Sequence, residues 1–392
     1  MQASNKYLVL GFFIAVIAWL LFSDRRFSDR FLLYIVFFIG LYLSLSLYTG
    51  GGITLPSIVA AFMKIVIAYL ILKTVDSRFS ETYIKLVVFL AVISLFGYLS
   101  DKYNLLEALV VKLPRGGDIS TGNTGYEGIF YLFRFPWHIT RNNSIFYEPG
   151  AYQAFLNAAL FLIFFTKTTF ERREKWIYIA ILVITLITTY STTGFLIFLA
   201  MFPLFLYKSD IFSFSNKALI IGAASIVVVA FSAQFYSTFV VKIDQYLSAG
   251  EHELGTSALE RGSDVIADMQ IFKKHIFGLG YDQYQEEFDR VGRRKVEGGS
   301  TNGVTKTLAM MGLPFSLFIF GSYLWAFKRL LGDLLLTTLA FSMFLLFLAG
   351  ESYYMATPIT YSIIAAAFVF YRGSAEDRSE LTASQGPPSV DR

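Results

Sequence analysis

Apolar blocks separated by shorter polar segments make up most of this chain. The first block runs from Tyr7 to Phe22 and is followed directly by SDRRFSDR, with no small-residue cleavage pattern, so we expect it to be kept as a membrane span. Further blocks have roughly the 20 residues that a helix needs to cross hydrocarbon, and they begin near Phe31, Ile53, Tyr83, Tyr147, Trp176, Gly194, Ala218, Val304, Leu331 and Thr357. The pattern predicts an all-α integral membrane protein with about eleven transmembrane helices.

Two long polar segments interrupt these blocks, at residues 100–145 and 241–301. Lys and Arg collect in the short loops on alternate turns, and the positive-inside rule marks those loops as cytoplasmic. Both long segments then face outward, where we expect them to form the active face. Residues 1–371 are interpreted as a single polytopic membrane domain, and the polar, aperiodic residues 372–392 as a disordered cytoplasmic tail.

The second polar segment contains one clear helical pattern. Its apolar stripe, which Arg261 continues at the N-terminal end, consists of Val265, Met269, Phe272 and Ile276. Such a helix is expected to lie flat on the membrane surface. The glycine pair at residues 278 and 280 is expected to end it.

Composition agrees with a membrane protein. Of the 392 residues, 55% are hydrophobic and 16% are charged, which lies outside the usual range of soluble domains. The net charge of +4 comes from Lys and Arg at segment ends, so it reports orientation in the bilayer rather than affinity for nucleic acid. The lack of cysteine excludes disulfide and thiolate chemistry, and three scattered histidines do not suggest a zinc site. We therefore expect a mechanism with no metal and no cofactor.

The sequence contains no internal repeat, no Walker-type phosphate loop and no clustered charges inside the apolar blocks. Pumps and ion-coupled transporters usually carry such loops, paired ionisable groups or broken helices. These observations weigh against an ATP-driven pump or an ion-coupled transporter.

Aromatic residues gather in the second part of the first polar segment, in the sequence IFYLFRFPWHIT. The part before it, RGGDISTGNTGYEG, is rich in Gly, Thr and Asn, which favours a mobile, solvated loop. Aromatic side chains with polar tips suit either the bilayer interface or the faces of sugar rings. On the second interpretation, Arg134 and Trp137 are candidate substrate-binding residues.

The sequence RNNSIFYEPGAYQAFL leads into the next apolar block. Pro149 presets the first helical turn, and Glu148 precedes it at the positive end of the helix dipole, so Glu148 either begins the helix or has a chemical role. Arg141 is harder to explain structurally, because it is predicted at the outward-facing side of the membrane, where the positive-inside rule does not require a cation.

The sequence STNGVTKTLAMMGLP begins another block and places Asn302 and Lys306, two candidate substrate-binding residues, on one face at the mouth of a helix. Lys306 either snorkels at the helix end or holds a phosphate as a point charge. The basic run from Arg290 to Lys295 is more typical of a solvated surface.

Arg141 and Arg261 together suggest a site for a lipid-borne anion, because arginine offers a planar fork to phosphate oxygens and keeps its charge. A diphosphate that leaves a sugar carbon gains negative charge in the transition state, where fixed guanidinium groups stabilise it most. An acceptor hydroxyl would attack from the opposite face, with Glu148 or Glu351 as the proton acceptor.

Four motifs in order resemble the bacterial O-antigen polymerase and O-antigen ligase superfamily. They are Arg141 followed by FYEPGAY, the STTG turn at residues 191–194, Arg261 followed by IFGLGYDQY, and STNGVTKTLAMMGLP. The resemblance implies a GT-C-like, multi-pass glycosyltransferase of the bacterial inner membrane. It would transfer a glycan from undecaprenyl diphosphate to an acceptor at the periplasmic face.

The resemblance also implies residue roles. Arg141 and Arg261 correspond to the family's diphosphate-binding arginines, and Tyr281 lies in a shared motif as a candidate substrate-binding residue. The ligase branch has a histidine shortly before the motif asparagine, where this chain has Ser-Thr, which favours a polymerase. His252 would substitute for that histidine in a ligase.

The predicted function is therefore polymerisation of an O-antigen or exopolysaccharide from lipid-linked repeat units. One alternative is an O-antigen ligase that uses another acceptor, such as lipid A core. The other is a lipid-linked oligosaccharide flippase, which predicts a basic cavity reaching both membrane faces. The expected partners are undecaprenyl-diphosphate-linked oligosaccharides, membrane lipids and a chain-length regulator, and not nucleic acid.

Overall fold

The computed structural model describes residues 27–118, 123–134, 140–146, 148–208, 257–292, 299–352 and 357–370, together with residues 11, 14 and 18. Helices form where the apolar blocks predict them: α2 (Asp29–Tyr48), α3 (Leu55–Val75), α4 (Phe79–Lys102), α6 (Pro149–Phe165), α7 (Arg172–Thr188), α8 (Thr192–Lys208), α14 (Gly303–Leu331), α15 (Leu334–Gly350) and α16 (Pro358–Val369). The block predicted near Ala218 and most of the first block lie outside the described residues.

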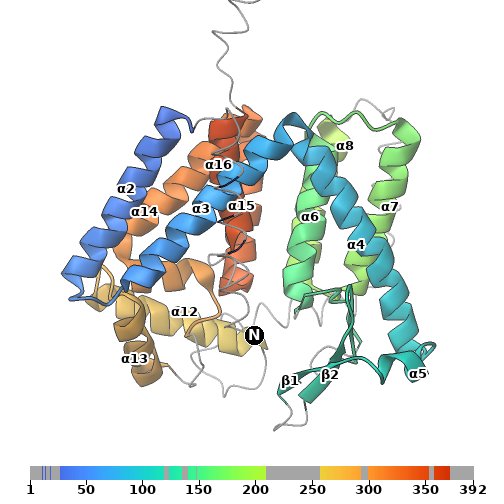
Figure 1. The fold of residues 1–392 in the computed structure, drawn as a ribbon, viewed down its shortest axis with the longest axis horizontal. Helices are drawn as coiled ribbons and strands as arrows, with labels where there is room; N and C mark the ends of the chain where they lie inside the picture. The colour runs from blue at the N-terminus through green and yellow to red at the C-terminus, as the bar shows by residue number, and fades with distance from the viewer. Residues whose placement is uncertain are drawn as a thin grey trace, which may run out of the picture.

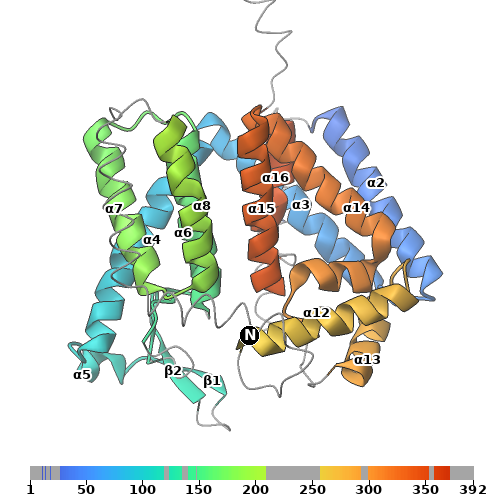
Figure 2. The ribbon, with the colours of Figure 1, turned by 180° about the vertical axis from the view of Figure 1, so that it is seen from behind.

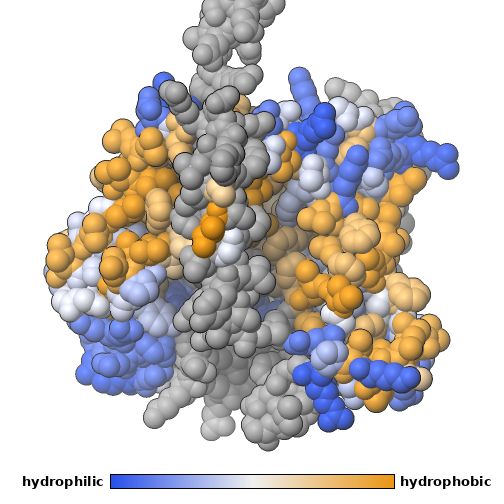
Figure 3. All heavy atoms as spheres, in the orientation of Figure 1, coloured by the Kyte–Doolittle hydropathy of each residue, from blue (hydrophilic) through white to orange (hydrophobic). Residues whose placement is uncertain are grey.

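Several of these helices have the length and composition of membrane spans. The segments Asp29–Tyr48, Leu55–Lys102 and Gly303–Leu331 are long and apolar enough to cross a bilayer, and α6, α8, α15 and α16 are shorter apolar helices. Figure 3 shows an apolar belt between more hydrophilic ends. On α2, Leu33 and Leu47 are 71% and 84% exposed, which suits contact with lipid. The chain is a mostly helical membrane protein, and the number of spans stays a prediction.

The described helices form two groups (Figures 1 and 2). One contains α2, α3, α14, α15 and α16, and the other contains α4, α6, α7 and α8. Each group contributes most of one buried apolar cluster, with α6 also entering the first cluster and α15 the second. The partly buried side chains that pack against both clusters are Phe146, Phe155, Phe327 and Phe347. The 3-10 turn η1 (Asp76–Arg78) connects α3, in the first group, to α4, in the second.

Both long polar segments contribute structure to the same end of the bundle, as the sequence predicts. There α12 (Ser257–Lys274) runs across the first group, and α13 (Tyr281–Val291) lies beside it (Figure 1). The second group is followed at this end by α5 (Glu107–Val110) and a small sheet. The basic last turns of α8 and α14 lie at the opposite end.

The sheet corrects the prediction of a mobile, solvated loop for RGGDISTGNTGYEG. Strands β1 (Arg115–Asp118), β2 (Asn123–Glu127) and β3 (Leu132–Phe133) pair antiparallel in the order β1-β2-β3. Arg115 is opposite Tyr126, and Tyr126 is opposite Phe133. The turn-rich composition predicted a mobile loop here, although aromatic residues on adjacent strands stabilise a hairpin.

A break in α14 at Gly312 was not predicted, because the apolar pattern continues through it. Gly312 has φ 77° and ψ 173°, which interrupts the helix. The linker between α12 and α13 replaces the lost hydrogen bonds: Gly280 N–H donates to the Met310 carbonyl at 2.9 Å, and Leu313 N–H donates to the Ile276 carbonyl at 2.8 Å. Irregular backbone within a span is tolerated where protein satisfies its polar groups in this way.

Glycines allow this crossing of backbones. A Cβ atom on Gly312 would lie 2.2 Å from the carbonyl carbon of Phe277, and one on Gly280 would lie 2.5 Å from the carbonyl oxygen of Gly52. Only glycine fits such distances and such positive φ angles. The motifs IFGLGYDQY and MMGLP are therefore in direct contact, and they fix α12 against α14.

Candidate active site

A buried polar network holds the segment that carries Arg141. Asn142 is fully buried, and its side-chain amide donates to the hydroxyls of Ser94 and Thr188 at 3.1 Å and 3.0 Å. Its backbone N–H donates to the Thr188 carbonyl at 2.8 Å. The Nε atom of Arg141 donates to the Thr189 carbonyl at 2.9 Å. Arg141 is thereby tied to the C-terminal end of α7.

Arg261 lies near the beginning of α12 and is half-buried. The helix packs against α14 through a buried face of Asp264, Ala267, Asp268 and Ile271. This corrects the predicted face: Val265, Met269 and Phe272 are only half-buried, and Ile276 lies beyond the helix and is 49% exposed. Figure 1 shows α12 running across the end of the first helix group, and its position flat on the membrane surface stays a prediction.

Glu351, at the C-terminal end of α15, brings three helices together. Its side chain is largely buried, and its Oε1 accepts a hydrogen bond from Nη2 of Arg261 at 3.1 Å. The same oxygen lies against the first turn of α6, where a Cβ atom on Gly150 would approach it to 2.7 Å. The carboxyl group therefore contacts both α12 and α6.

Glu148 precedes Pro149 at the N-terminus of α6, as expected for a helix start. However, its side chain does not cap the helix N–H groups. It forms a hydrogen bond with Glu351 instead. Two carboxyl groups can share a hydrogen bond only when one of them is protonated, and the raised pKa of Glu351 favours a proton on that group at neutral pH.

Arg141, Glu148, Arg261 and Glu351 form one electrostatic cluster. Burial and the neighbouring Glu148 raise the pKa of Glu351 to about 9, against the opposing effects of Arg261 and Arg141. Burial and the like charge of Arg261 lower the pKa of Arg141, against the opposing effects of Glu148 and Glu351. With one proton on the carboxyl pair, two guanidinium groups face one carboxylate. The cluster therefore keeps a positive charge for an anion.

A second polar network connects α12, α13 and α14, and the sequence analysis overlooked it. Asp268 is fully buried and accepts hydrogen bonds from the hydroxyls of Tyr284 and Thr305 at 2.7 Å and 2.6 Å. Asp264 accepts hydrogen bonds from the N–H and the hydroxyl of Thr301 at 2.9 Å and 2.8 Å. Burial raises the pKa of Asp268 to about 6 despite its donors. This network secures the helix that presents Arg261.

A signal for this network was present in the sequence. Arg261, Asp264 and Asp268 are spaced by three and four residues, so they share one side of the helix. Charged residues on one face are usually solvated, and the neighbouring apolar stripe was the more conventional choice for the buried side.

Asn302 and Lys306 have partners within the protein. The Asn302 side chain caps α14, because its oxygen accepts hydrogen bonds from the N–H groups of Val304 and Thr305 at 3.0 Å and 3.1 Å. Lys306 lies within the electrostatic field of Asp268 and Asp264. The predicted substrate-binding roles of Asn302 and Lys306 thus compete with structural roles.

The other predicted binding residues do not join the arginine cluster. Arg134 forms an ion pair with Glu107 at 2.9 Å. Tyr281 donates its backbone N–H to the Gly52 carbonyl at 2.7 Å, beside the turn between α2 and α3. Trp137 and His252 lie outside the described residues.

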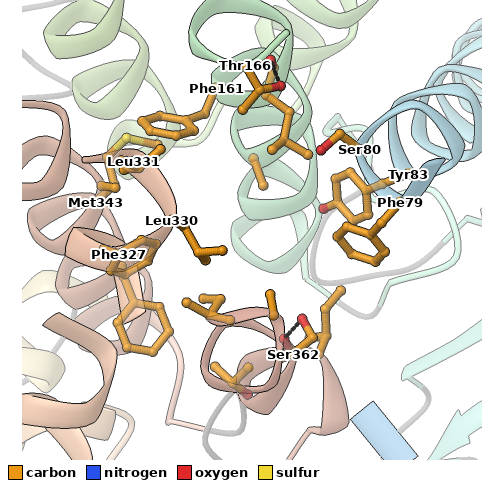
Figure 4. A pocket seen from close by; sticks show the side chains of 18 of the residues that line it. Phe79, Ser80, Tyr83, Phe161, Thr166, Phe327, Leu330, Leu331, Met343 and Ser362 are labelled. Atoms are coloured by element: carbon orange, nitrogen blue, oxygen red, sulfur yellow. Dashed lines mark hydrogen bonds between the residues drawn. The ribbon is translucent and has the colours of Figure 1, made fainter. Parts of the chain in front are cut away.

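An apolar cavity of about 680 Å³ lies between the two helix groups, with side chains from α4, α6, α14, α15 and α16 around it (Figure 4). It extends from Ser80 and Leu331 at the end opposite the sheet to Ala154 and Leu348. Leu348 is about one helical turn from Glu351. The described lining includes neither Lys nor Arg.

A separate polar cavity of about 740 Å³ adjoins Arg141 and the end of α4. Arg134 lines it as well, whereas Arg261 is not among the described residues of its wall. Glu148 and Glu351 thus connect Arg141 with Arg261. Arg141 belongs to their cluster and also lines this cavity.

The sequence matches no family model, and it matches no curated protein.

Proposed function

We propose that this protein is a membrane glycosyltransferase that polymerises undecaprenyl-diphosphate-linked oligosaccharides. The observation that carries the proposal is the cluster of Arg141, Arg261, Glu148 and Glu351 at one end of a helical membrane protein. Glycosyl transfer from a lipid diphosphate needs cations for the leaving group and an acceptor for one proton. The cluster supplies both.

The guanidinium groups would act on the donor. The bond between the anomeric carbon of the growing glycan and its diphosphate oxygen breaks, and the electron pair leaves with the diphosphate. Arg141 and Arg261 stabilise the negative charge that develops on the leaving diphosphate. A bound metal ion has this role in other transferases. Hydrogen bonds anchor both side chains, that of Arg141 to Thr189 and that of Arg261 to Glu351. Their guanidinium groups are therefore oriented before the reaction.

The carboxyl pair would act on the acceptor. A hydroxyl of the incoming repeat unit forms the new bond to the anomeric carbon, and its proton passes to the carboxylate of the Glu148 and Glu351 pair. The carboxyl group that already holds a proton cannot take this one, so the acceptor is the carboxylate that remains in the pair. The proton is released to water after the products leave.

The apolar cavity supports a lipid-linked substrate. It is lined by side chains of five membrane helices and approaches the cluster near Leu348. A polyprenyl chain would lie there with its diphosphate at the arginines. A basic path through both membrane faces, as expected of a flippase, is not supported by this cavity, because its described lining includes neither Lys nor Arg. We assign that end to the periplasmic face of the bacterial inner membrane.

A ligase would use the same donor chemistry with a different acceptor. At the position where the ligase branch has histidine, Thr301 instead donates its hydroxyl hydrogen bond to Asp264 and Ser300 is buried beside Tyr284. These residues secure α12 rather than face a substrate, which favours the polymerase.

The test is complementation of a deletion strain. Arg261→Ala is expected to leave lipid-linked single repeats and no long polymer, with normal protein level. The matched control is Arg290→Ala, which removes an exposed arginine on α13 that is paired with Glu287. Polymer of normal length from the Arg261→Ala variant would refute the proposal. Loss of export of single repeats would instead point to the flippase.

A further inference from the structure

The polar cavity beside Arg141 has features that diphosphate binding leaves unexplained. Its volume of about 740 Å³ lies within the range of small-molecule sites. Its described lining includes the side chains of Tyr98, Asp101, Lys102, Asn104 and Tyr190. Tyrosine, amide and carboxylate groups offer several hydrogen-bonding positions, as a ligand rich in hydroxyl groups requires.

Lys102 is the cation of this cavity that remains for a ligand. Arg134 is paired with Glu107, and Arg141 belongs to the cluster with Glu351. Lys102 forms no ion pair with a described residue; its Nζ atom interacts with the Tyr98 hydroxyl and lies 5.8 Å and 5.9 Å from the ring centres of Tyr98 and Tyr103. A lysine acts as one compact, mobile charge, without the planar fork by which arginine binds two oxygens at once.

Asp101 argues against a multiply charged ligand in this cavity. One of its oxygens accepts the backbone N–H of Arg134 at 2.9 Å. A diphosphate next to this carboxylate would be repelled, whereas sugar hydroxyls can donate hydrogen bonds to it. The described lining has three cations, of which Arg134 is paired with Glu107 and Arg141 is assigned to the diphosphate, so one cation is left for one negative charge on the ligand.

The backbone around the cavity is unusually shaped. Asn104, Arg134 and Tyr190 have φ angles of 53°, 47° and 48°, and they make up three of the five non-glycine residues with positive φ in the described chain. Such conformations gather at binding sites, where the surrounding structure holds them in place. Tyr190 is 51% exposed, so its ring is available to a ligand.

We propose that this cavity binds an acidic sugar of the glycan, with the sugar carboxylate on Lys102 and the sugar ring against Tyr190. This inference rests on the proposed function and adds a substrate class to it: the repeat unit contains a carboxylate-bearing sugar. Arg141 at the border then holds the diphosphate while the glycan extends into the cavity.

The first test is the composition of the polymer that depends on this gene. A carboxylate-bearing sugar in the repeat unit is expected. If deletion of the gene leaves polymer length unchanged, the proposed function itself fails. If the polymer disappears on deletion but contains only neutral sugars, the proposed function stands and this inference fails alone.

The second test uses oligosaccharide fragments of that polymer and the full-length protein in nanodiscs. Reduction of the sugar carboxylates to alcohols is expected to weaken binding by about tenfold or more, because one charge pair is lost. Lys102→Gln should bind both forms equally weakly. Lys112→Gln, which removes an exposed lysine of the same segment, should resemble the unmodified protein.

Equal binding of native and reduced fragments by the unmodified protein would overturn the inference. A further comparison measures binding of undecaprenyl diphosphate that carries no glycan. If Lys102→Gln weakens its binding as strongly as that of the fragments, the lysine serves a lipid phosphate and the sugar assignment is wrong.

Discussion

The Oε1 atom of Glu351 lies 3.1 Å from Nη2 of Arg261, and this contact joins the end of α15 to the beginning of α12. Glu351 also shares a hydrogen bond with Glu148 at the start of α6. The contact therefore connects a cation proposed to bind the diphosphate with the carboxyl pair proposed to take the proton. A change to any of these side chains alters both the charge and the proton affinity of the site.

Glu148→Gln separates proton transfer from a simple helix start. Because the Glu148 side chain does not cap α6, the variant is expected to keep its melting temperature. Its polymerisation rate should fall by about 100-fold or more, as for loss of a proton acceptor. Rates are measured on purified protein with lipid-linked oligosaccharides, and melting temperatures in the same detergent.

The matched control for this substitution is Glu171→Gln, at the exposed N-terminus of α7, where the side chain likewise makes no cap. This control should change neither the polymerisation rate nor the melting temperature. If Glu148→Gln retains its rate and loses stability by at most ~1 kcal/mol, Glu148 only begins the helix.

Binding of the diphosphate should weaken at high pH. The pKa of Glu351 is raised to about 9, so its proton is present below that pH and is lost as the pH rises through it. A second carboxylate then faces Arg141 and Arg261, and the affinity for undecaprenyl diphosphate is expected to fall by up to about tenfold per pH unit. Titration of binding across this range checks the expectation. Glu351→Gln should remove the pH dependence, and a dependence that persists in this variant would assign it to another group.

Gly312→Ala should strongly destabilise the protein. The added Cβ atom would lie 2.2 Å from the backbone of Phe277, at a φ of 77° that only glycine adopts readily. The strained φ alone costs about 1–3 kcal/mol, and the clash separates the α12–α13 linker from α14. Thermal unfolding in detergent measures the loss.

Gly321→Ala is the control in the same helix. A Cβ atom there would meet nothing within 4 Å, and alanine favours a helix by about 1 kcal/mol over glycine. Its melting temperature is therefore expected to stay or rise. Equal effects of the two substitutions would show that the crossing at Gly312 does not hold α12 in place.

The apolar helices within the described residues were predictable, because each begins within a few residues of a predicted apolar block. The prediction that both long polar segments share one end also agrees with the structure. The β-hairpin and the break at Gly312 were not predictable in the same way. The hairpin pairs two short, Gly-rich strands that lack an alternating apolar pattern. The break in α14 depends on hydrogen bonds from a distant part of the chain, the backbone near Gly280.

The candidate site was predictable in part. Arg141 was noticed because an outer-face cation lacked a topological explanation, and Glu148 and Glu351 because carboxylates border the spans. The pairing of these residues depends on how three helices meet, which spacing in one sequence cannot show. Asp268 was missed for the opposite reason: its position on a helix suggested solvent, whereas Tyr284 and Thr305 bury it.

The central claim is that Arg141 and Arg261 bind one lipid diphosphate. Its most direct measurement is the affinity of the purified protein in nanodiscs for undecaprenyl diphosphate. Arg141→Ala and Arg261→Ala should each weaken this affinity by about tenfold or more, as loss of a charged hydrogen-bonding partner does, while Arg290→Ala leaves it unchanged. Affinity equal to that of the unmodified protein in either of the first two variants would contradict the claim.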